Sequence, residues 1–452
     1  MHEASALLIN PWIYDFAAFD FWAKPAGLLV AGSILREAGV RVHLVDCMDV
    51  HHPAMARAGL ASRKRDASGR GKFHRERAET PDVFEGITRP YSRYGMPPAL
   101  FARLLEEIDP PDVILVTCAM TYWYAGAFEA IHILKGRFPK APVVLGGIYA
   151  TLCPDHARRF SGADFVLEGP FEAVSPEAAS DIPVLRELLP VPRRSLEDLP
   201  RPCLDLYPKL DHVPLMTSRG CPYRCAYCGV HLLFPGYEKR GAASVAEEIA
   251  RWHRDRGIRN FAIYDDALLA DAHGHLFPLL EAIADLNLPL GFHAASGMHI
   301  RGIDDAAASL LRRAGFETLR LGLETHRDDG RAPGDHKVTS KELDQAVASL
   351  VRAGYDPGRI GVYVLAGLPG QQVYEVEEAV DFVLGLGVRP HLAEYSPVPG
   401  SPMWKDAVRA SGYDLESEPL TQNNTVFPCV PDAGDRARIA KVRNRLRNLF
   451  RP

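Results

Sequence analysis

Short, continuously apolar runs alternate with segments of helical periodicity through the first 180 residues. Strands that are apolar on both faces and are separated by helices are typical of a parallel sheet with helices on both sides. The pattern therefore predicts a doubly wound, Rossmann-like α/β domain over residues 1–180, with right-handed crossovers. The expected strands are 6–10, 40–46, 112–117, 142–147 and 164–168, and the clearest helices are 25–38 and 126–137.

A polar insertion, residues 51–96, interrupts this pattern and is rich in Arg and Lys. Connections of this length are uncommon inside a compact domain and are usually functional or disordered. Two interpretations stay open. The insertion is either a solvated surface loop or a flap over a binding site. As a flap, its cations Lys72, Arg75 and Arg77 would suit an anionic substrate, and Phe73 and His74 would exclude water.

The second half of the chain has a different pattern of proline and apolar residues. Prolines crowd residues 181–212, which predicts a semi-rigid linker. Residues 213–400 then alternate six apolar strand candidates with helical patterns, which suits a partial (β/α)6 barrel. In such barrels the site lies at the carboxyl ends of the strands. Residues 401–452 are expected to form a helical C-terminal extension with a basic final helix over 435–450.

Composition and charge narrow the class of protein. The chain has 452 residues, 47% of them apolar, and a formal charge of −5, which argues against a large nucleic-acid footprint. No apolar run reaches the length of a membrane span or a signal peptide, so no membrane association and a cytoplasmic location are expected. Five scattered cysteines are expected to be small buried apolar residues: Cys47, Cys118, Cys153, Cys203 and Cys429.

The remaining three cysteines carry the candidate chemistry. Cys221, Cys225 and Cys228 stand in one loop after the first barrel strand. Close-spaced thiolates suit an iron–sulfur cluster or zinc. A structural zinc site needs four ligands, and the only nearby candidate for a fourth is His231. Three thiolates can instead hold three irons of a four-iron, four-sulfur cluster and leave the fourth iron open. The spacing Cys-x3-Cys-x2-Cys, with Tyr227 before the last cysteine, resembles the signature of the radical S-adenosylmethionine (SAM) superfamily.

Further landmarks of that superfamily follow at the expected strand ends. The resemblance implies a 4Fe-4S cluster that cleaves SAM reductively and yields a 5′-deoxyadenosyl radical. Where the family often has Gly-Gly-Glu, this chain has Asp265 and Asp266, so the carboxylate that meets the SAM amine is left open between these and Glu324. In addition to the three cysteine ligands, the resemblance implies cofactor-binding roles for Tyr227, Gly229, Asp265, Asp266, Ser296, Glu324, Gly367 and Pro369.

The N-terminal domain resembles the cobalamin-binding domain that precedes many radical SAM barrels. The resemblance rests on the helix start at Lys24 and on two strand ends, and it implies cofactor-binding roles for Thr117, Gly146, Gly147 and Thr151. The Asp-x-His-x-x-Gly motif is absent, so cobalamin binding and a vestigial fold both stay open. The aromatic run 122–124 would either stack beneath a corrin ring or form a core cluster.

These features predict a radical SAM enzyme that starts radical chemistry on a small-molecule or peptide substrate. A flavodoxin- or ferredoxin-like protein is the expected electron donor. With cobalamin the leading outcome is methyl transfer, and rearrangement or ring formation is also possible. Without it, rearrangement, carbon–sulfur insertion or peptide modification would result. Two competing interpretations are a non-catalytic iron–sulfur or zinc scaffold and a tRNA- or ribosome-modifying enzyme. The strand-end landmarks disfavour the first, and the acidic charge disfavours the second.

Overall fold

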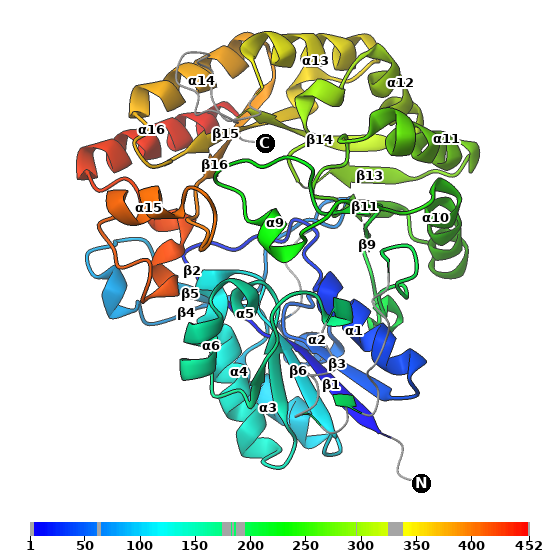
Figure 1. The fold of residues 1–452 in the computed structure, drawn as a ribbon, viewed down its shortest axis with the longest axis vertical. Helices are drawn as coiled ribbons and strands as arrows, with labels where there is room; N and C mark the ends of the chain where they lie inside the picture. Colours follow the sequence, from blue (N-terminus) through cyan, green and yellow to red (C-terminus); the bar gives the residue numbers. More distant parts are fainter. Residues whose placement is uncertain are drawn as a thin grey trace. The chain divides into compact units, whose positions relative to one another are not determined.

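The computed structural model describes residues 4–60, 65–173, 182, 185–186, 195–294, 296–323 and 338–450. The chain divides into two compact units (Figure 1). The N-terminal unit comprises Met1–Leu210 together with Ser417–Gln422, and the barrel unit comprises Asp211–Glu416 together with Asn423–Pro452. Glu324 and residues 181, 183–184 and 187–194 of the proline-rich linker lie outside the described residues.

The N-terminal unit is built on a five-stranded parallel sheet of order β3-β1-β6-β7-β8, as the apolar runs predict. Leu7 and Ile9 of β1 belong to the core cluster formed with helices α3 and α4. Leu8 points the other way, toward Gly32 of helix α1. Both faces of the sheet are therefore covered. The strands are β1 (Ser5–Asn10), β3 (Arg41–Asp46), β6 (Val113–Thr117), β7 (Val143–Gly146) and β8 (Phe165–Val166), and the helices are α1 (Ala26–Glu37), α3 (Pro98–Glu106), α4 (Tyr124–Arg137), α5 (Ile148–Leu152) and α6 (Pro154–Phe160).

Much of the insertion is a folded part of this unit. Strands β4 (Arg75–Arg77) and β5 (Ser92–Tyr94) pair with β2 (Ile13–Asp15) in a small antiparallel sheet, and a short helix α2 (Pro53–Arg57) precedes them. Phe73 is only 3% exposed and packs in the main core with Tyr94 and Met96. The expectation that Phe73 closes a site is therefore wrong, because its apolar ring is used to build the core.

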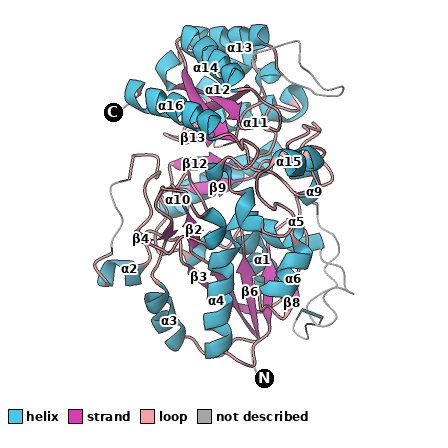
Figure 2. Cartoon of the chain, turned by 90° about the vertical axis from the view of Figure 1, so that its left-hand side faces the viewer, coloured by secondary structure: helices cyan, strands magenta, loops and turns pink. Residues whose placement is uncertain are grey.

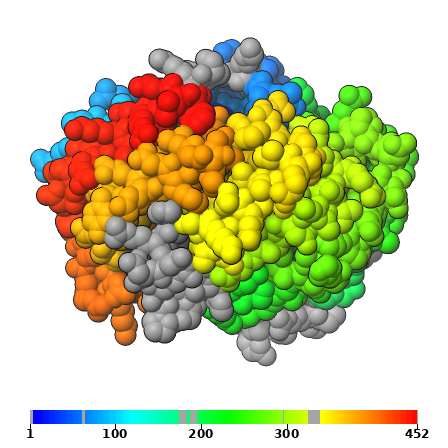
Figure 3. Space-filling view, turned by 90° about the horizontal axis from the view of Figure 1, so that it is seen from above, coloured from blue at the N-terminus to red at the C-terminus, as the bar shows by residue number. Residues whose placement is uncertain are grey.

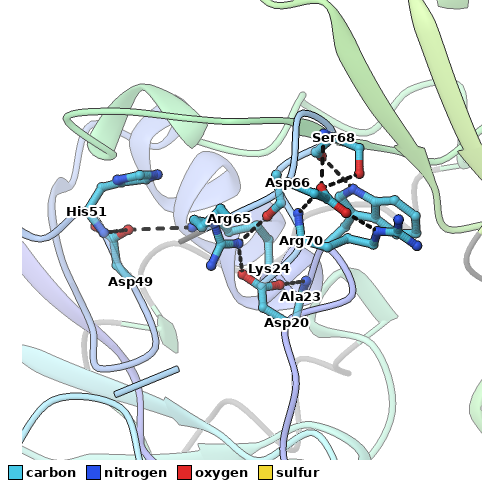
Figure 4. A network of polar contacts seen from close by, with 11 residues as sticks. Asp20, Ala23, Lys24, Asp49, His51, Arg65, Asp66, Ser68 and Arg70 are labelled. Atoms are coloured by element: carbon cyan, nitrogen blue, oxygen red, sulfur yellow. Dashed lines mark hydrogen bonds and ion pairs between the residues drawn. The ribbon is translucent and has the colours of Figure 1, made fainter. Parts of the chain in front are cut away.

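A polar network fastens the first half of the insertion to the segment after β2 (Figure 4). Asp20 forms an ion pair with Arg65, and both side chains are less than a tenth exposed. The main chain of Asp20 also bonds to Gly71 in both directions, at 2.9 and 3.2 Å. Lys24 lies 3.8 Å from the buried Asp49. Removing one partner of such a buried ion pair leaves an uncompensated charge, so these contacts hold the insertion in place.

The barrel unit is a six-stranded parallel sheet whose strands follow one another in chain order, β9-β12-β13-β14-β15-β16. This order is that of a partial barrel, as predicted, with helices on its outer side (Figures 1 and 2). Phe261, Phe292 and Phe316 stack across three neighbouring strands at 5.4–5.5 Å. The strands are β9 (Val213–Leu215), β12 (Asn260–Ile263), β13 (Gly291–Ala294), β14 (Phe316–Leu323), β15 (Ile360–Ala366) and β16 (Arg389–Glu394), and the helices are α10 (Ala242–Arg256), α11 (Phe277–Asp285), α12 (Asp305–Arg313), α13 (Ser340–Arg352) and α14 (Val373–Gly385).

The C-terminal part of the chain contains helices α15 (Trp404–Ala410) and α16 (Ala433–Leu449). Helix α16, red in Figure 3, packs beside α14. Its basic residues face acidic partners there: Arg438 lies 2.7 Å from Glu377 and Arg445 lies 2.7 Å from Asp381. The basic final helix thus neutralises charge within the barrel unit. Within the described part of the chain, no helix has the length and apolar character of a membrane span.

Candidate active site

The cysteine loop lies at the carboxyl end of the first barrel strand. After β9 the chain forms β10 (Ser218–Arg219), which pairs with β11 (Glu238–Lys239), and the loop ends at helix α9 (Val230–Leu233). Cys221, Cys225 and Cys228 are all partly exposed. Four of the other cysteines are buried, as expected: Cys47, Cys118, Cys203 and Cys429, whereas Cys153, also expected to be buried, is partly exposed. Accessible thiols are what a cluster requires of its ligands.

Burial disfavours the ionised form of two of the loop thiols. Burial raises the pKa of the Cys221 thiol, and the neighbouring Cys228 and Asp266 raise it further. Burial likewise raises the pKa of Cys228. Such thiols ionise readily only when a positive centre compensates their charge. Among the described residues no three His, Cys, Asp or Glu side chains converge on one ion position. The thiolates of a cluster bind different irons, so they need no such common point. Cys221, Cys225 and Cys228 would hold the cluster.

Asp265 holds the start of this loop. Its carboxylate is 2% exposed and accepts hydrogen bonds from the Thr217 amide at 2.7 Å and from the Thr217 and Ser218 hydroxyls at 2.5 and 2.7 Å. Burial raises its pKa to about 6. The sequence suggested that Asp265 contacts SAM. In the structure its side chain points into the protein and accepts three hydrogen bonds there. We therefore assign Asp265 to the support of the loop.

A buried histidine extends this contact. His275 Nε2 lies 3.2 Å from the Thr217 hydroxyl and is 4% exposed. It stands in a π-helical turn, Ala272–Leu276, of the kind that is frequent near functional sites. Burial lowers its pKa, which favours the neutral imidazole as a hydrogen-bond partner. Sequence reasoning missed His275, because no motif distinguishes it from a core residue.

Asp266 shapes the turn directly before the first cysteine. Its Oδ2 accepts a hydrogen bond from the Gly220 amide at 2.9 Å. Gly220 has φ +78°, and a Cβ there would lie 1.8 Å from the Gly236 carbonyl oxygen, so only glycine fits. Asp266 is half-buried, unlike its neighbour. Of the two carboxylates it is therefore the one that retains access to a ligand.

The next strand end supports the opposite side of the loop. The ring of Tyr223, between the first two cysteines, stacks on His299 with centroids 4.2 Å apart and planes 15° apart. Met298 bonds to the main chain of β14 at 2.6 and 3.2 Å, which fixes the segment that carries His299. Ser296, at the start of this segment, is exposed. The order of strand-end landmarks in the sequence pointed to residues 296–299, but nothing in the sequence indicated that His299 contacts Tyr223.

The far end of the loop packs against the C-terminal part of the barrel unit. Tyr227 contacts the small core formed by Tyr395, Ala407, Leu415 and Cys429. The Met403 amide donates to the Ala226 carbonyl at 3.0 Å. A Cβ on Gly229 would lie 2.6 Å from Val398 Cγ1, so the glycine permits this close approach. Tyr227 thus has a packing role that the sequence did not indicate, while its main chain stays beside the cysteines.

The bend after β15 is built by a glutamine that sequence reasoning missed. The Gln371 side chain accepts from the amides of Gly367 and Leu368 at 2.7 and 3.2 Å and donates to the Leu365 carbonyl at 3.0 Å. Gly367 has φ +89° and is buried, whereas Pro369 is half-exposed. These contacts give the carboxyl end of β15 a fixed shape.

In the N-terminal unit the predicted residues meet after strands β6 and β7. Gly147 has φ +93°, and a Cβ there would lie 2.7 Å from Thr117 Oγ1 and 2.8 Å from the Cys118 carbonyl oxygen. Thr151 Oγ1 donates to the Gly147 carbonyl and accepts from the Gly169 amide, both at 2.9 Å. Thr117, Gly147 and Thr151 therefore build the turn itself.

Gly146 is the residue of this turn that leaves room for a ligand. A Cβ on Gly146 would have a single neighbour within 4 Å, the Leu167 carbonyl oxygen at 3.9 Å. Ligands of open α/β sheets bind beyond the carboxyl ends of the strands, which is where this turn lies. The turn therefore fits the close approach of a cofactor such as cobalamin.

The aromatic run after β6 is packed inside the unit. Tyr122 is 4% exposed, Trp123 Nε1 donates to Asp15 at 2.8 Å, and the Tyr124 hydroxyl donates to Glu418 at 2.8 Å. These contacts favour the core-cluster interpretation over a ring that stacks beneath a corrin.

Comparisons with known proteins agree with both units. Residues 215–383 match the model of the radical SAM superfamily, and residues 94–179 match that of the B12-binding domain. An uncharacterized methyltransferase of Pyrococcus horikoshii is 25% identical over 338 residues, which are 68% of this chain and 71% of the relative. The anaerobic magnesium-protoporphyrin IX monomethyl ester cyclase of Synechocystis sp. is 28% identical over 246 residues, 48% of this chain and 49% of the relative.

Solved structures with similar folds are also found. The radical S-adenosylmethionine methyltransferase TsrM from Kitasatospora setae, with cobalamin and a [4Fe-4S] cluster bound, superposes with a TM-score of 0.64 at 19% identity, covering 90% of this chain and 78% of that chain. The cobalamin-dependent S-adenosylmethionine radical enzyme OxsB superposes with a TM-score of 0.57 at 14% identity, covering 94% of this chain and 56% of that chain. At this identity the likeness concerns the fold.

Proposed function

We propose that this chain, which belongs to the radical SAM superfamily and carries a B12-binding domain ahead of its barrel, catalyses cobalamin-dependent methyl transfer from SAM to a small-molecule or peptide substrate. The observation that carries the proposal is the presence of both sites in one chain, an accessible three-cysteine loop and an open glycine turn. A relative that is named a methyltransferase, and that aligns with 68% of this chain, supports it.

Different residues of the chain would bind the cluster and hold the cysteine loop in place. A four-iron, four-sulfur cluster supplies an electron and an iron with an open site, and a corrinoid supplies a carrier for a methyl group. Cys221, Cys225 and Cys228 would bind three irons. Asp265 and Asp266 would hold the main chain of residues 217–220 so that the thiols keep their spacing. His299 would hold the loop through Tyr223 on its other side.

The remaining strand ends would bind SAM. Glu324, directly after β14, would accept from the SAM amine, with Asp266 as the alternative carboxylate. Ser296, exposed after β13, would bond to the ribose or to the SAM carboxylate. The main chain near Tyr227 and at Gly367–Pro369 would contact the adenine. Each of these residues follows a different strand of the partial barrel, and their convergence at one edge is the usual placement of such sites.

The reaction would need an external electron donor of the flavodoxin or ferredoxin kind, and we place it in the cytoplasm. None of the eight cysteines, all of which the structure describes, forms a disulfide, which suits a reducing compartment. The acidic net charge supports a small-molecule or peptide substrate over a nucleic acid.

Isotope labelling tests the proposal. The protein, purified anaerobically and supplied with cobalamin and a reductant, would be incubated with SAM labelled in its methyl group and with an extract of small molecules and peptides. We expect the label in a new product, and only when corrinoid is present. Ring formation is the second candidate, which the similarity to a cyclase supports. It would give 5′-deoxyadenosine and a product that carries no label.

A further inference from the structure

Residues 417–422 come from the C-terminal part of the chain but belong to the N-terminal unit. They form a 3-10 turn, Pro419–Gln422, in which Leu420 is 7%, Thr421 0% and Gln422 1% exposed. The B12-binding match ends at residue 179, so this segment lies outside it. These residues lie more than 200 positions after the rest of the N-terminal unit, yet they are buried in it. We therefore asked which contacts keep them there.

Glu418 is the polar centre of this segment. Its Oε1 accepts from the Tyr124 hydroxyl at 2.8 Å and from the Leu420 amide at 2.9 Å. Its carbonyl oxygen accepts from the Thr421 hydroxyl at 2.6 Å, which closes the turn. The turn therefore presents a half-buried carboxylate to Tyr124, and burial raises the pKa of Tyr124, so its hydroxyl stays protonated and donates.

Tyr124 connects Glu418 to the turn formed by Gly146 and Gly147. Its ring stacks on Tyr149 with centroids 5.5 Å apart and planes 26° apart. Tyr149 is fully buried and stands in α5, the helix that begins directly after Gly147. The Tyr149 amide donates to the Cys118 carbonyl at 3.2 Å, and its hydroxyl lies 2.6 Å from His156 Nδ1. Tyr124 begins the helix that follows β6 and Tyr149 lies in the one that follows β7, so both flank the carboxyl edge of the sheet.

We infer that Glu418 is a positioning residue for the cobalamin site: through Tyr124 and Tyr149 it sets the place of α5 and hence the shape of the Gly146–Gly147 turn. The inference rests on the proposed function in that it takes cobalamin as the ligand of this edge. A second contact acts in the same direction, because the side chain of Gln422, which is 1% exposed, lies beside Cys153, the residue directly after α5. The C-terminal segment is then part of the cobalamin-binding unit.

Titration of the full-length protein with hydroxocobalamin tests the inference, with absorbance reporting the dissociation constant. Tyr124→Phe removes the hydroxyl and keeps the stacked ring, and Glu418→Ala removes the acceptor. We expect each change to weaken cobalamin binding about ten-fold, in the range of one hydrogen bond to a charged group. The double variant should bind no more weakly than either single variant, because both changes remove one contact. Glu418→Gln keeps an acceptor oxygen and should recover part of the loss.

Glu416→Ala is the control, since Glu416 is exposed directly before this segment, and the cobalamin affinity of this variant should equal that of the wild type. Iron content should be unchanged in every variant. Unchanged cobalamin affinity in Tyr124→Phe and Glu418→Ala would overturn the inference, whatever happens to their melting temperatures, and so would additive losses in the double variant. A wild-type protein that binds no cobalamin would overturn the proposed methyl transfer as well, and the inference with it.

Discussion

Asp265 and Thr217 form a double contact beneath the cysteine loop: the carboxylate accepts from both the amide and the hydroxyl of Thr217, at 2.7 and 2.5 Å. Thr217 lies two residues after the end of β9 and four residues before Cys221. The carboxyl end of β12 is thereby fastened to the start of the loop that follows β9. Buried charged hydrogen bonds are specific in geometry, so this contact fixes where the loop begins.

Asp265→Ala should therefore destabilise the loop and reduce its cluster. Three buried donors lose their acceptor, at a cost of about 1–3 kcal/mol for each donor left unsatisfied. We expect a lower melting temperature and fewer irons and sulfides per chain after anaerobic reconstitution. Asp285→Ala, at an exposed position of α11, serves as the control. An Asp265→Ala protein with wild-type iron content would show that the loop is held without this contact.

Cys228→Ala should abolish both the cluster and SAM cleavage, because the chain offers no fourth cysteine in the loop to replace a lost ligand. Iron and sulfide analysis together with detection of 5′-deoxyadenosine measures the effect. Replacement of Cys47 by Ala should leave the iron content intact, since this buried thiol packs in the core of the N-terminal unit. Retained SAM cleavage in Cys228→Ala would contradict the assignment of the ligands.

Glu324→Gln should weaken SAM binding while the cluster remains, because the change keeps the size of the side chain and removes its charge. A hydrogen bond to a charged group contributes about 1.5–3 kcal/mol, which corresponds to a loss of roughly ten-fold or more. Equilibrium binding of SAM to the reconstituted protein gives the affinity. If the affinity is unchanged, Asp266 or another group accepts from the SAM amine.

Gly146→Val should block the corrinoid without unfolding the protein, because the added side chain enters open space at the glycine turn. Gly147→Ala should instead lower the melting temperature even without cofactor. At φ +93° a Cβ is strained, and it would lie 2.7 Å from Thr117 Oγ1. Corrinoid absorbance and thermal unfolding distinguish the two effects. Full corrinoid binding by Gly146→Val would place the cofactor elsewhere.

The two sheets and the cysteine loop could be predicted from sequence because their signals are local. Apolar runs separated by helices define parallel strands, and three cysteines at short spacing remain together in any fold. The order of landmarks after Cys228 gave the strand ends for the same reason, since each landmark follows its own strand.

The roles of particular residues at these ends could not be predicted, since they depend on contacts across the fold. Asp265 and Asp266 are adjacent acidic residues in the sequence, yet one is 2% exposed and the other is half-buried. Phe73 lies in a polar segment, yet its side chain packs in the main core of the N-terminal unit. Glu418 and Tyr124 meet across 294 residues of chain, a contact that no local pattern encodes.

A joint count of iron, sulfide and corrinoid in anaerobically purified protein tests whether one chain carries two cofactor sites. We expect about four irons and four sulfides per chain together with bound corrinoid. Cys228→Ala should lose the iron and keep the corrinoid, whereas Gly146→Val should lose the corrinoid and keep the iron. Wild-type protein that contains neither iron nor corrinoid after reconstitution would show that the chain has neither cofactor site.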